Sequence, residues 1–324
     1  NAKQAAFFYA SAFGFQVEQV SDLTTGSRTT AQYLLTQGNI RFILETALTS
    51  DHPVAEECRK FGDGVKDVAL TVLDAERAWE QARRNGGESA YEPKTWSDAN
   101  GSVTFAGIKT YGRAQHTFVS RTGAYALPAV KNGGLFMPGF RKVEGFALNA
   151  YNKANPCGLK YVDHAVGNVE EGKMNHWVKW YEEVLGFAMF KHFDDKDIGT
   201  EYSALMSKVM ASGNHLIKMP INEPAEGKKK SQIEEYINFY RGSGVQHIAV
   251  ATDNIVETVT ALKERGVEFL YVPNTYYQDI LERVGPIEED LEPLQRLGIL
   301  IDRDEDGYLL QLFTKPVMDR PTVF

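Results

Sequence analysis

Two histidines occupy matching places in two apolar, strand-like segments of the chain. His164 lies within residues 161–166, and His247 lies within residues 245–251. Side chains alternate between the two faces of a strand, so His164 shares a face with Val162, and His247 shares one with Ala249. Two neutral imidazoles that face each other suit a divalent metal ion. The alternative is that each is a hydrogen-bonded histidine of the core.

The segment around His247 occurs a second time, 180 residues earlier in the chain. Residues 62–70 read Gly-Asp-Gly-Val-Lys-Asp-Val-Ala-Leu, and residues 242–250 read Gly-Ser-Gly-Val-Gln-His-Ile-Ala-Val. The register continues beyond the segment, since Gly64, Asp74 and Gly86 match Gly244, Asn254 and Gly266. At the position of His247 the first copy carries Asp67. The pattern indicates a duplication that keeps metal chemistry in the second half only.

Short polar side chains on neighbouring predicted strands could line the same interior as the histidines. The segment 203–207 alternates small polar residues with larger apolar ones, and ends in Ser207. Asn222 shares a strand face with Pro220, and Gln311 shares one with Phe313. Buried amides and hydroxyls cost free energy unless they are paired. A bound carboxylate or keto acid would pair with them, and an internal hydrogen-bond network is the alternative.

The elements that must position these residues follow one repeated order. The second, third and fourth units open with strands at 65–72, 159–166 and 245–251. Each continues with a helix, at 74–85, 174–185 and 254–265, and then with strands at about 102–110 and 115–121, at 202–210 and 216–221, and in a hairpin that ends at 308–314. The first unit has a matching helix that closes on Gly14, and the strand expected before Asn1 is absent from the sequence.

The pattern predicts an α+β fold of four tandem βαβββ units. Units one and two form an N-terminal domain over residues 1–122 without a metal site, and units three and four form a C-terminal catalytic domain over 156–324. Residues 123–155 are rich in Gly, Pro and Ala and are interpreted as the linker. Two such units together form a partly closed barrel whose interior can hold a ligand.

Composition excludes several classes of partner. The net charge of −8 argues against nucleic acid, which requires a basic face. No apolar run approaches the roughly 20 residues that cross a membrane, and the N-terminus lacks the order of a signal peptide. Two cysteines, Cys58 and Cys157, form no disulfide framework and suit a reducing cytoplasm.

Several segments together resemble the vicinal oxygen chelate (glyoxalase-like) superfamily and, within it, the 4-hydroxyphenylpyruvate dioxygenases. The segments that carry the resemblance are residues 162–168, 201–208, 220–224, 228–232, 244–249, 302–315 and 319–324. The resemblance implies iron(II) held by His164, His247 and a glutamate that is expected beyond Phe324. It also implies that Gln232, Gln246 and Gln311 serve catalysis and that these three, with Ser207, Asn222 and Phe313, surround the substrate. Regular alternation places Gln246 on the face opposite His247, so its implied role requires a twist or a bulge.

The function that the resemblance implies is conversion of 4-hydroxyphenylpyruvate and O2 to homogentisate and CO2, in tyrosine and phenylalanine catabolism. The substrate supplies its own α-keto acid, so no second keto acid is required. Two alternatives remain: 4-hydroxymandelate synthesis from the same substrate, and a non-catalytic ligand-binding protein on the same scaffold. The resemblance further implies a cytoplasmic homo-oligomer, either a dimer or a tetramer, without a nucleic-acid or membrane partner.

Two further expectations concern the ends of the two halves. The N-terminal cavity should be filled by apolar side chains such as Phe42, Val68 and Phe118 rather than by a metal. Residues 322–324 should begin the closing strand of the fourth unit, so that a carboxylate one or two residues past Phe324 would face both histidines.

Overall fold

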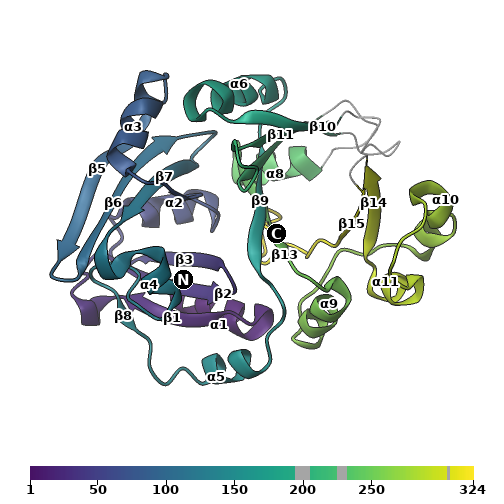
Figure 1. Cartoon of the computed structure of the whole chain (residues 1–324), viewed down its shortest axis with the longest axis horizontal. Helices are drawn as coiled ribbons and strands as arrows, with labels where there is room; N and C mark the ends of the chain where they lie inside the picture. The colour runs from purple at the N-terminus through teal and green to yellow at the C-terminus, as the bar shows by residue number, and fades with distance from the viewer. Residues whose placement is uncertain (194–204, 225–231, 305–306) are drawn as a thin grey trace.

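The computed structural model describes residues 1–193, 205–224, 232–304 and 307–324, and it has the expected α+β architecture (Figure 1). Two four-stranded sheets form the N-terminal half. A five-stranded sheet and a two-stranded hairpin lie in the C-terminal half. Within the described residues every sheet is open, so the expected units are present but their partly closed barrels are not.

The N-terminal half holds the first two units. The first unit consists of α1 (Ala2–Phe13), β1 (Gln16–Ser21), η1 (Leu23–Thr25), β2 (Thr30–Gln37), β3 (Ile40–Ala47) and α2 (Pro53–Phe61). The second consists of β4 (Leu70–Thr71), α3 (Ala75–Arg84), β5 (Ser89–Asp98), β6 (Gly101–Lys109) and β7 (Gln115–Arg121). The strand orders are β3-β2-β1-β8 and β4-β7-β6-β5, where β8 belongs to the segment that follows the second unit.

That following segment, interpreted from the sequence as a linker, is folded against the N-terminal sheets. It contains η2 (Gly123–Tyr125), α4 (Leu127–Lys131), β8 (Arg141–Lys142) and α5 (Ala147–Ala154). Tyr125, Val130 and Phe140 are buried in one cluster with Leu34 of β2 and Val103 of β6. The segment therefore packs against both N-terminal sheets before the chain continues into the C-terminal half.

The C-terminal half positions both candidate histidines. Its elements are β9 (Tyr161–Asn168), α6 (Met174–Leu185), β10 (Ala188–Phe193), β11 (Leu205–Ala211), β12 (Lys218–Pro224), α8 (Gln232–Tyr240), β13 (Gly244–Ala251), α9 (Ile255–Glu264), η3 (Asn274–Tyr277), α10 (Ile280–Val284), α11 (Leu291–Leu297), β14 (Leu300–Asp304) and β15 (Gly307–Gln311). The five-stranded sheet runs β10-β11-β12-β9-β13, so the opening strands β9 and β13 of the two units are antiparallel neighbours.

Helix boundaries agree with the repeat. The Asp74 side chain accepts a hydrogen bond from Arg77 N at 3.0 Å, and its counterpart Asn254 accepts one from Glu257 N at 3.1 Å. These side-chain oxygens pair with backbone N–H groups that the first helical turn leaves free. Gly14 and Gly186 both end their helices with a left-handed backbone, at φ 74° and 68°. The helices α3 and α9 therefore begin by the same chemistry, and α1 and α6 end by the same chemistry, as the repeat predicted.

The predicted strand at 65–72 is wrong over most of its length. Only Leu70–Thr71 forms a strand, while Val65 makes an isolated bridge to Val245 and Asp67 makes one to Gln115. The segment pairs with different neighbours in turn, because Val65 contacts the C-terminal half while Leu70 continues the N-terminal sheet beside Phe118. Apolar alternation predicted the burial here but not the change of partner.

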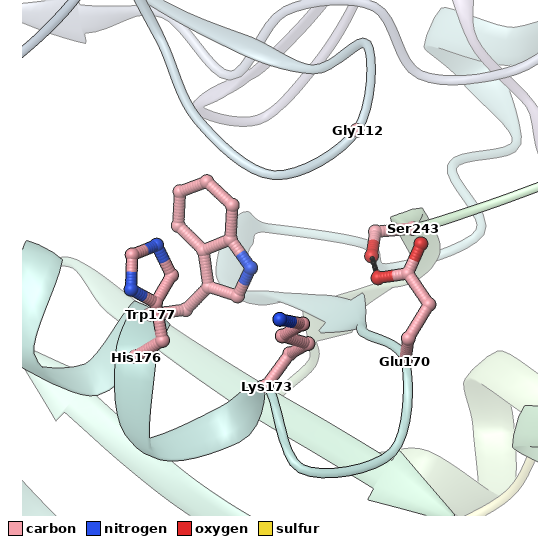
Figure 2. Close-up of a pocket in the computed structure, with 6 residues that line it drawn as sticks. All are labelled: Gly112, Glu170, Lys173, His176, Trp177 and Ser243. Carbon is pink, nitrogen blue, oxygen red and sulfur yellow. Dashed lines mark hydrogen bonds between the residues drawn. The ribbon is translucent and has the colours of Figure 1, made fainter.

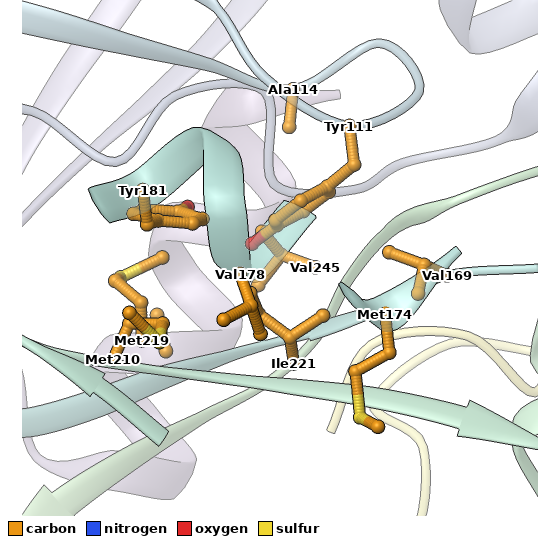
Figure 3. Packing of buried hydrophobic residues seen from close by; sticks show 11 residues of the cluster. Tyr111, Ala114, Val169, Met174, Val178, Tyr181, Met210, Met219, Ile221 and Val245 are labelled. Carbon is orange, nitrogen blue, oxygen red and sulfur yellow. The ribbon is translucent and has the colours of Figure 1, made fainter. Parts of the chain in front are cut away.

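A buried cluster joins the two halves around α6 (Figure 3). Tyr111 and Ala114 from the turn between β6 and β7 pack there with Val178 and Tyr181 of α6. A Cβ added to Gly167 on β9 would lie 2.3 Å from a Tyr111 ring carbon, so only glycine permits this approach. The face of β9 that carries Gly167 thus packs against the N-terminal half. The opposite face, which carries His164, remains available for the site.

Candidate metal and substrate site

His164 and His247 face each other from the adjacent strands β9 and β13. Their ring centroids are 5.8 Å apart and the rings are nearly perpendicular, at 72°. In the strand register His164 lies opposite Ala249 and His247 lies opposite Val166, so the two histidines are diagonal neighbours on one face of the sheet. The structure therefore brings together the two residues that sequence reasoning assigned to a metal.

A β-bulge next to each histidine turns the preceding side chain toward it. The register of β13 with β9 shifts between Val245 and His247, which leaves Gln246 as the extra residue. It shifts again between Ala249 and Val250, and there Asp163 of β9 is the extra residue. A bulge disturbs strict alternation and re-aims side chains. This resolves the conflict over Gln246: its amide lies beside the His247 ring, because the strand is bulged at that residue.

Each bulged residue fixes the Nδ1 atom of its histidine. Asp163 Oδ2 lies 2.8 Å from His164 Nδ1, and Gln246 Oε1 lies 3.1 Å from His247 Nδ1. Both oxygens are acceptors, so each Nδ1 donates its N–H and the lone pair of the neutral ring is on Nε2. Within the described residues neither Nε2 takes part in a hydrogen bond. Two facing imidazoles with free Nε2 atoms form a donor set that suits a divalent metal ion.

The charge states of His247 and Asp163 favour the binding of a cation. Burial, followed by repulsion from His164, lowers the pKa of His247 to about 3, so its ring is neutral near pH 7. The hydrogen bond with His164, aided by one with Lys218 and opposed by burial, lowers the pKa of Asp163 to about 2. Asp163 is therefore ionised. Lys218 Nζ lies 2.8 Å from Asp163 Oδ1 and balances its charge.

Aromatic rings enclose His247 on two sides. The Phe324 ring stacks on it at 5.1 Å between centroids with an interplanar angle of 16°. Phe313 meets it edge-on at 5.7 Å. Phe324 also joins the edge of β13 through its backbone, since its N–H donates to Gln246 O at 3.0 Å. Phe324 thus pairs with β13 through its backbone, although residues 322–324 do not form the strand that the sequence predicted.

A row of buried polar side chains crosses the same face of the sheet. In the register Ser207 of β11 is opposite Asn222 of β12, and Asn222 is opposite Asn168 of β9. Their exposed fractions are 5%, 9% and 0%. Among the described residues, both amide atoms of Asn168 and the amide oxygen of Asn222 have no hydrogen-bond partner. Orphaned buried amides cost about 1–3 kcal/mol each, so this row is suited to pairing with a bound polar group or water.

The remaining predicted side chains, Gln232 and Gln311, lie on other elements. Gln232 is the first residue of α8 and is exposed. Gln311, at the end of β15, donates through Nε2 to Asp302 Oδ2 at 2.7 Å across the β14–β15 hairpin. The structure therefore places Gln246 and Phe313 beside His247, and it places Ser207 and Asn222 on the sheet face that carries both histidines. Among the described residues, no hydrogen bond joins Gln232 or Gln311 to either histidine.

Sequence reasoning missed three residues of the site. Asp163 and Lys218 support His164, and Asn168 extends the polar row. A signal for Asn168 was present, because His164, Val166 and Asn168 are spaced by two along one strand. Asp163 gave none, since regular alternation places it on the face opposite His164.

In the N-terminal half, Asp67 occupies the position that corresponds to His247, and both of its carboxylate oxygens accept hydrogen bonds. Asp67 Oδ1 accepts from Thr117 N at 3.1 Å, and Asp67 Oδ2 accepts from Gln115 Nε2 at 2.7 Å and from the Thr117 hydroxyl. The expectation of one apolar cavity there is wrong in detail. Phe42, Val68 and Phe118 belong to three separate clusters.

A cavity of about 400 Å³ lies between the halves, and neither His164 nor His247 lines it (Figure 2). It is lined by Gly112, Glu170, Lys173, His176, Trp177 and Ser243. The Ser243 hydroxyl donates to the Glu170 carboxylate inside it. None of these residues was a candidate for chemistry. No cluster of three or more His, Cys, Asp or Glu with metal-ligand geometry occurs in the described part of the chain, so the histidine pair remains the candidate metal site.

Known proteins resemble this chain over its whole length. Residues 162–312 match the family model of the glyoxalase, bleomycin resistance protein and dioxygenase superfamily, and this range includes both histidines. A 4-hydroxyphenylpyruvate dioxygenase of Yarrowia lipolytica is 49% identical over the whole of this chain and 82% of its own length. One of Danio rerio is 45% identical, again over the whole chain and over 81% of its own length.

The chain belongs to the 4-hydroxyphenylpyruvate dioxygenase family. A solved structure of a mutant 4-hydroxymandelate synthase from Streptomyces coelicolor supports the same fold, with a TM-score of 0.82 over the whole chain and 88% of the other protein. Its sequence identity of 25% is well below that of the dioxygenases. Membership in the dioxygenase family implies a metal cofactor, for which the paired imidazoles are the candidate ligands. None of the described helices is both long and apolar enough to cross a bilayer.

Proposed function

We propose that this chain is an iron(II) dioxygenase that converts 4-hydroxyphenylpyruvate and O2 to homogentisate and CO2, as a step of tyrosine catabolism. The observation that carries the proposal is the pair of facing imidazoles, each with its Nδ1 fixed by the preceding residue. Identity of 44–49% to dioxygenases of that name supports the choice of substrate.

His164 and His247 would hold the metal through Nε2. A bound iron(II) supplies activation of O2 and open positions that an α-keto acid can occupy. Two histidines leave room for a carboxylate ligand, and the glutamate expected beyond Phe324 stays a prediction. Asp163 and Gln246 orient the two rings, which raises their ligand basicity and fixes the direction of the lone pairs.

The polar row and the aromatic wall would orient the organic substrate. Ser207, Asn222 and Gln246 present a hydroxyl and two amides on the histidine face, each at most 9% exposed. Hydrogen bonds to them would fix the position of the substrate, and its ring would pack against Phe313. Gln232 and Gln311 are proposed to join the site when substrate binds. Burial of the row excludes water, which strengthens each polar contact.

A product assay tests the proposal. Iron(II)-loaded protein should consume O2, release CO2 and form homogentisate from 4-hydroxyphenylpyruvate in equal amounts. Formation of 4-hydroxymandelate instead would assign the chain to the alternative for which the Streptomyces structure provides the precedent. Tight binding of the substrate without O2 uptake would identify a ligand-binding protein and overturn the enzymatic proposal.

We also propose that the protein acts in the cytoplasm as a homo-oligomer. Cys58 is exposed and unpaired, and Cys157 is buried and unpaired, which is in keeping with a reducing compartment. Sedimentation velocity of the purified protein would test the oligomer directly, and a single species at the monomer mass of 36.2 kDa would contradict it.

A further inference from the structure

The two halves of the molecule meet at repeat-related residues. Val65 and Val245, which match in the duplication, form an isolated antiparallel bridge with each other. The preceding glycines, Gly64 and Gly244, both lie against the Tyr240 ring at the end of α8. A Cβ on Gly64 would be 2.8 Å from the Tyr240 Oη, and one on Gly244 would be 2.4 Å from a ring carbon. Tyr240 is therefore held between equivalent segments of both halves.

Arg113, in the turn between β6 and β7, holds the same tyrosine from the N-terminal half. Its Nη2 donates to Tyr240 O at 3.0 Å, and its guanidinium carbon lies 4.3 Å from the Tyr240 ring centroid. The other face of the guanidinium covers Phe61 of α2 at 3.2 Å. Tyr240 is the last residue of α8. The last carbonyls of a helix lack donors within the helix and carry its negative dipole end, so a cation there stabilises the helix terminus.

Helix α8 links this contact to the substrate side of the site. It begins at Gln232, the residue proposed to reach the substrate. Midway, Tyr236 donates through its hydroxyl to Val245 O at 3.1 Å. Val245 directly precedes the bulged Gln246, so α8 also supports the strand segment that presents Gln246 and His247. A shift of α8 would therefore displace Gln232 and loosen the bulge.

We infer that Arg113 is a positioning residue, through which the N-terminal half fixes α8 and thereby the substrate-facing glutamines. This inference rests on the proposed function for the identity of the substrate. An arginine also lies at the end of α2, since side-chain atoms of Arg320 would be 3.0 Å from a Cβ placed on Gly62. Helix α2 carries no candidate site residue, so only the Arg113 contact reaches the chemistry.

Steady-state kinetics of Arg113→Ala, Arg113→Lys and the control Arg84→Ala test the inference in the full, iron-loaded chain. Arg84 forms an exposed ion pair with Glu80 within α3, far from α8 in the sequence. Arg113→Ala should raise KM for 4-hydroxyphenylpyruvate by about tenfold, the size of one lost cation–π or charged hydrogen-bond contact, with iron content unchanged and kcat less affected. Arg113→Lys should recover part of the loss, and Arg84→Ala should match the wild type.

Two further measurements separate positioning from stability. In the double variant Arg113→Ala/Gln232→Ala the effects on KM should be less than additive, because Arg113 acts through the helix that carries Gln232. Hydrogen exchange of the amides of residues 232–240 should be faster in Arg113→Ala than in Arg84→Ala. A wild-type KM in Arg113→Ala, or fully additive effects, would overturn the inference. If the wild type forms no homogentisate, the proposed function fails. Independently of that result, an unchanged exchange rate in α8 would show that Arg113 does not fix this helix.

Discussion

At the scale of single residues, the site depends on the side chains that precede the two histidines. Asp163 and Gln246 each bind the Nδ1 of the next residue, so each histidine brings its own orienting group from its own strand. A histidine ligand whose second nitrogen is hydrogen-bonded loses less rotational freedom when it binds a metal. Loss of such a hydrogen-bond partner typically lowers metal affinity about 10- to 100-fold. The two bulges are the means by which adjacent residues reach one face.

Asp163→Leu should therefore weaken iron(II) binding by about 10- to 100-fold, because the His164 ring loses its acceptor. Asp163→Asn keeps an oxygen at the same place and should lose less. Titration of the metal-free variants with iron(II), followed by measurement of bound metal, compares the two. Equal affinity in Asp163→Leu and the wild type would show that His164 needs no orienting group.

His247→Ala should abolish iron(II) binding while the fold persists. The ring contacts Phe313 and Phe324 edge-on and by stacking, so its removal should also cost about 1–3 kcal/mol of unfolding free energy. Circular dichroism and chemical denaturation report the fold, and metal analysis reports the iron. Loss of the folded state at ambient temperature would identify His247 as a structural residue of the core.

Asn222→Ala and Gln232→Ala should weaken turnover but leave the iron in place, since these amides address the substrate. The expected loss in kcat/KM corresponds to about 1–3 kcal/mol for one buried hydrogen bond. In Asn222→Ala the orphaned amide oxygen disappears with the side chain, so the metal-free fold should be no less stable. Iron release from either variant would contradict the assignment.

At the scale of elements, β9 carries His164 on one face and packs on the N-terminal half with the other. Gly167 is the contact point, and a methyl group there would overlap the Tyr111 ring. Gly167→Ala should destabilise the protein by about 1–3 kcal/mol through overpacking. Gly213→Ala is the matched control, because its Cβ would meet open space. Denaturant unfolding of both variants measures this change in stability. An unchanged midpoint in Gly167→Ala would show that the turn at Tyr111 can move to accommodate the methyl group.

Regular patterns in the sequence predicted the regular elements well. The caps Asp74 and Asn254, the stops at Gly14 and Gly186, and the facing of His164 and His247 follow from local chemistry and period-two alternation. The bulge at Gln246 could not be predicted, because the register of a strand depends on a partner that is distant in sequence. The true course of residues 65–69 was missed for the same reason, since Val65 pairs across the two halves.

At the scale of the whole molecule, the sequence repeat indicates two related halves, and the histidine pair lies in the C-terminal one. The halves are joined by the cluster around α6, by the hydrogen bond at 2.7 Å between His116 and Tyr181, and by the Arg113 contact on α8. Burial lowers the pKa of His116, so its ring is neutral where it forms this hydrogen bond between the halves. The N-terminal half thus acts as a scaffold that fixes the back of β9 and the end of α8.

The same division predicts one metal ion per chain, bound in the C-terminal half. In the N-terminal half Asp67 replaces the histidine, and hydrogen bonds from Thr117 and Gln115 already occupy its two oxygens. These hydrogen bonds leave Asp67 little acceptor capacity for a cation, whereas His164 and His247 face each other with their Nε2 atoms available. Anomalous scattering from iron-loaded crystals should therefore give a single peak per chain, between His164 and His247. A second peak near Asp67 would show that the first half has kept a metal site, and that the hydrogen bonds of Asp67 open to admit the ion.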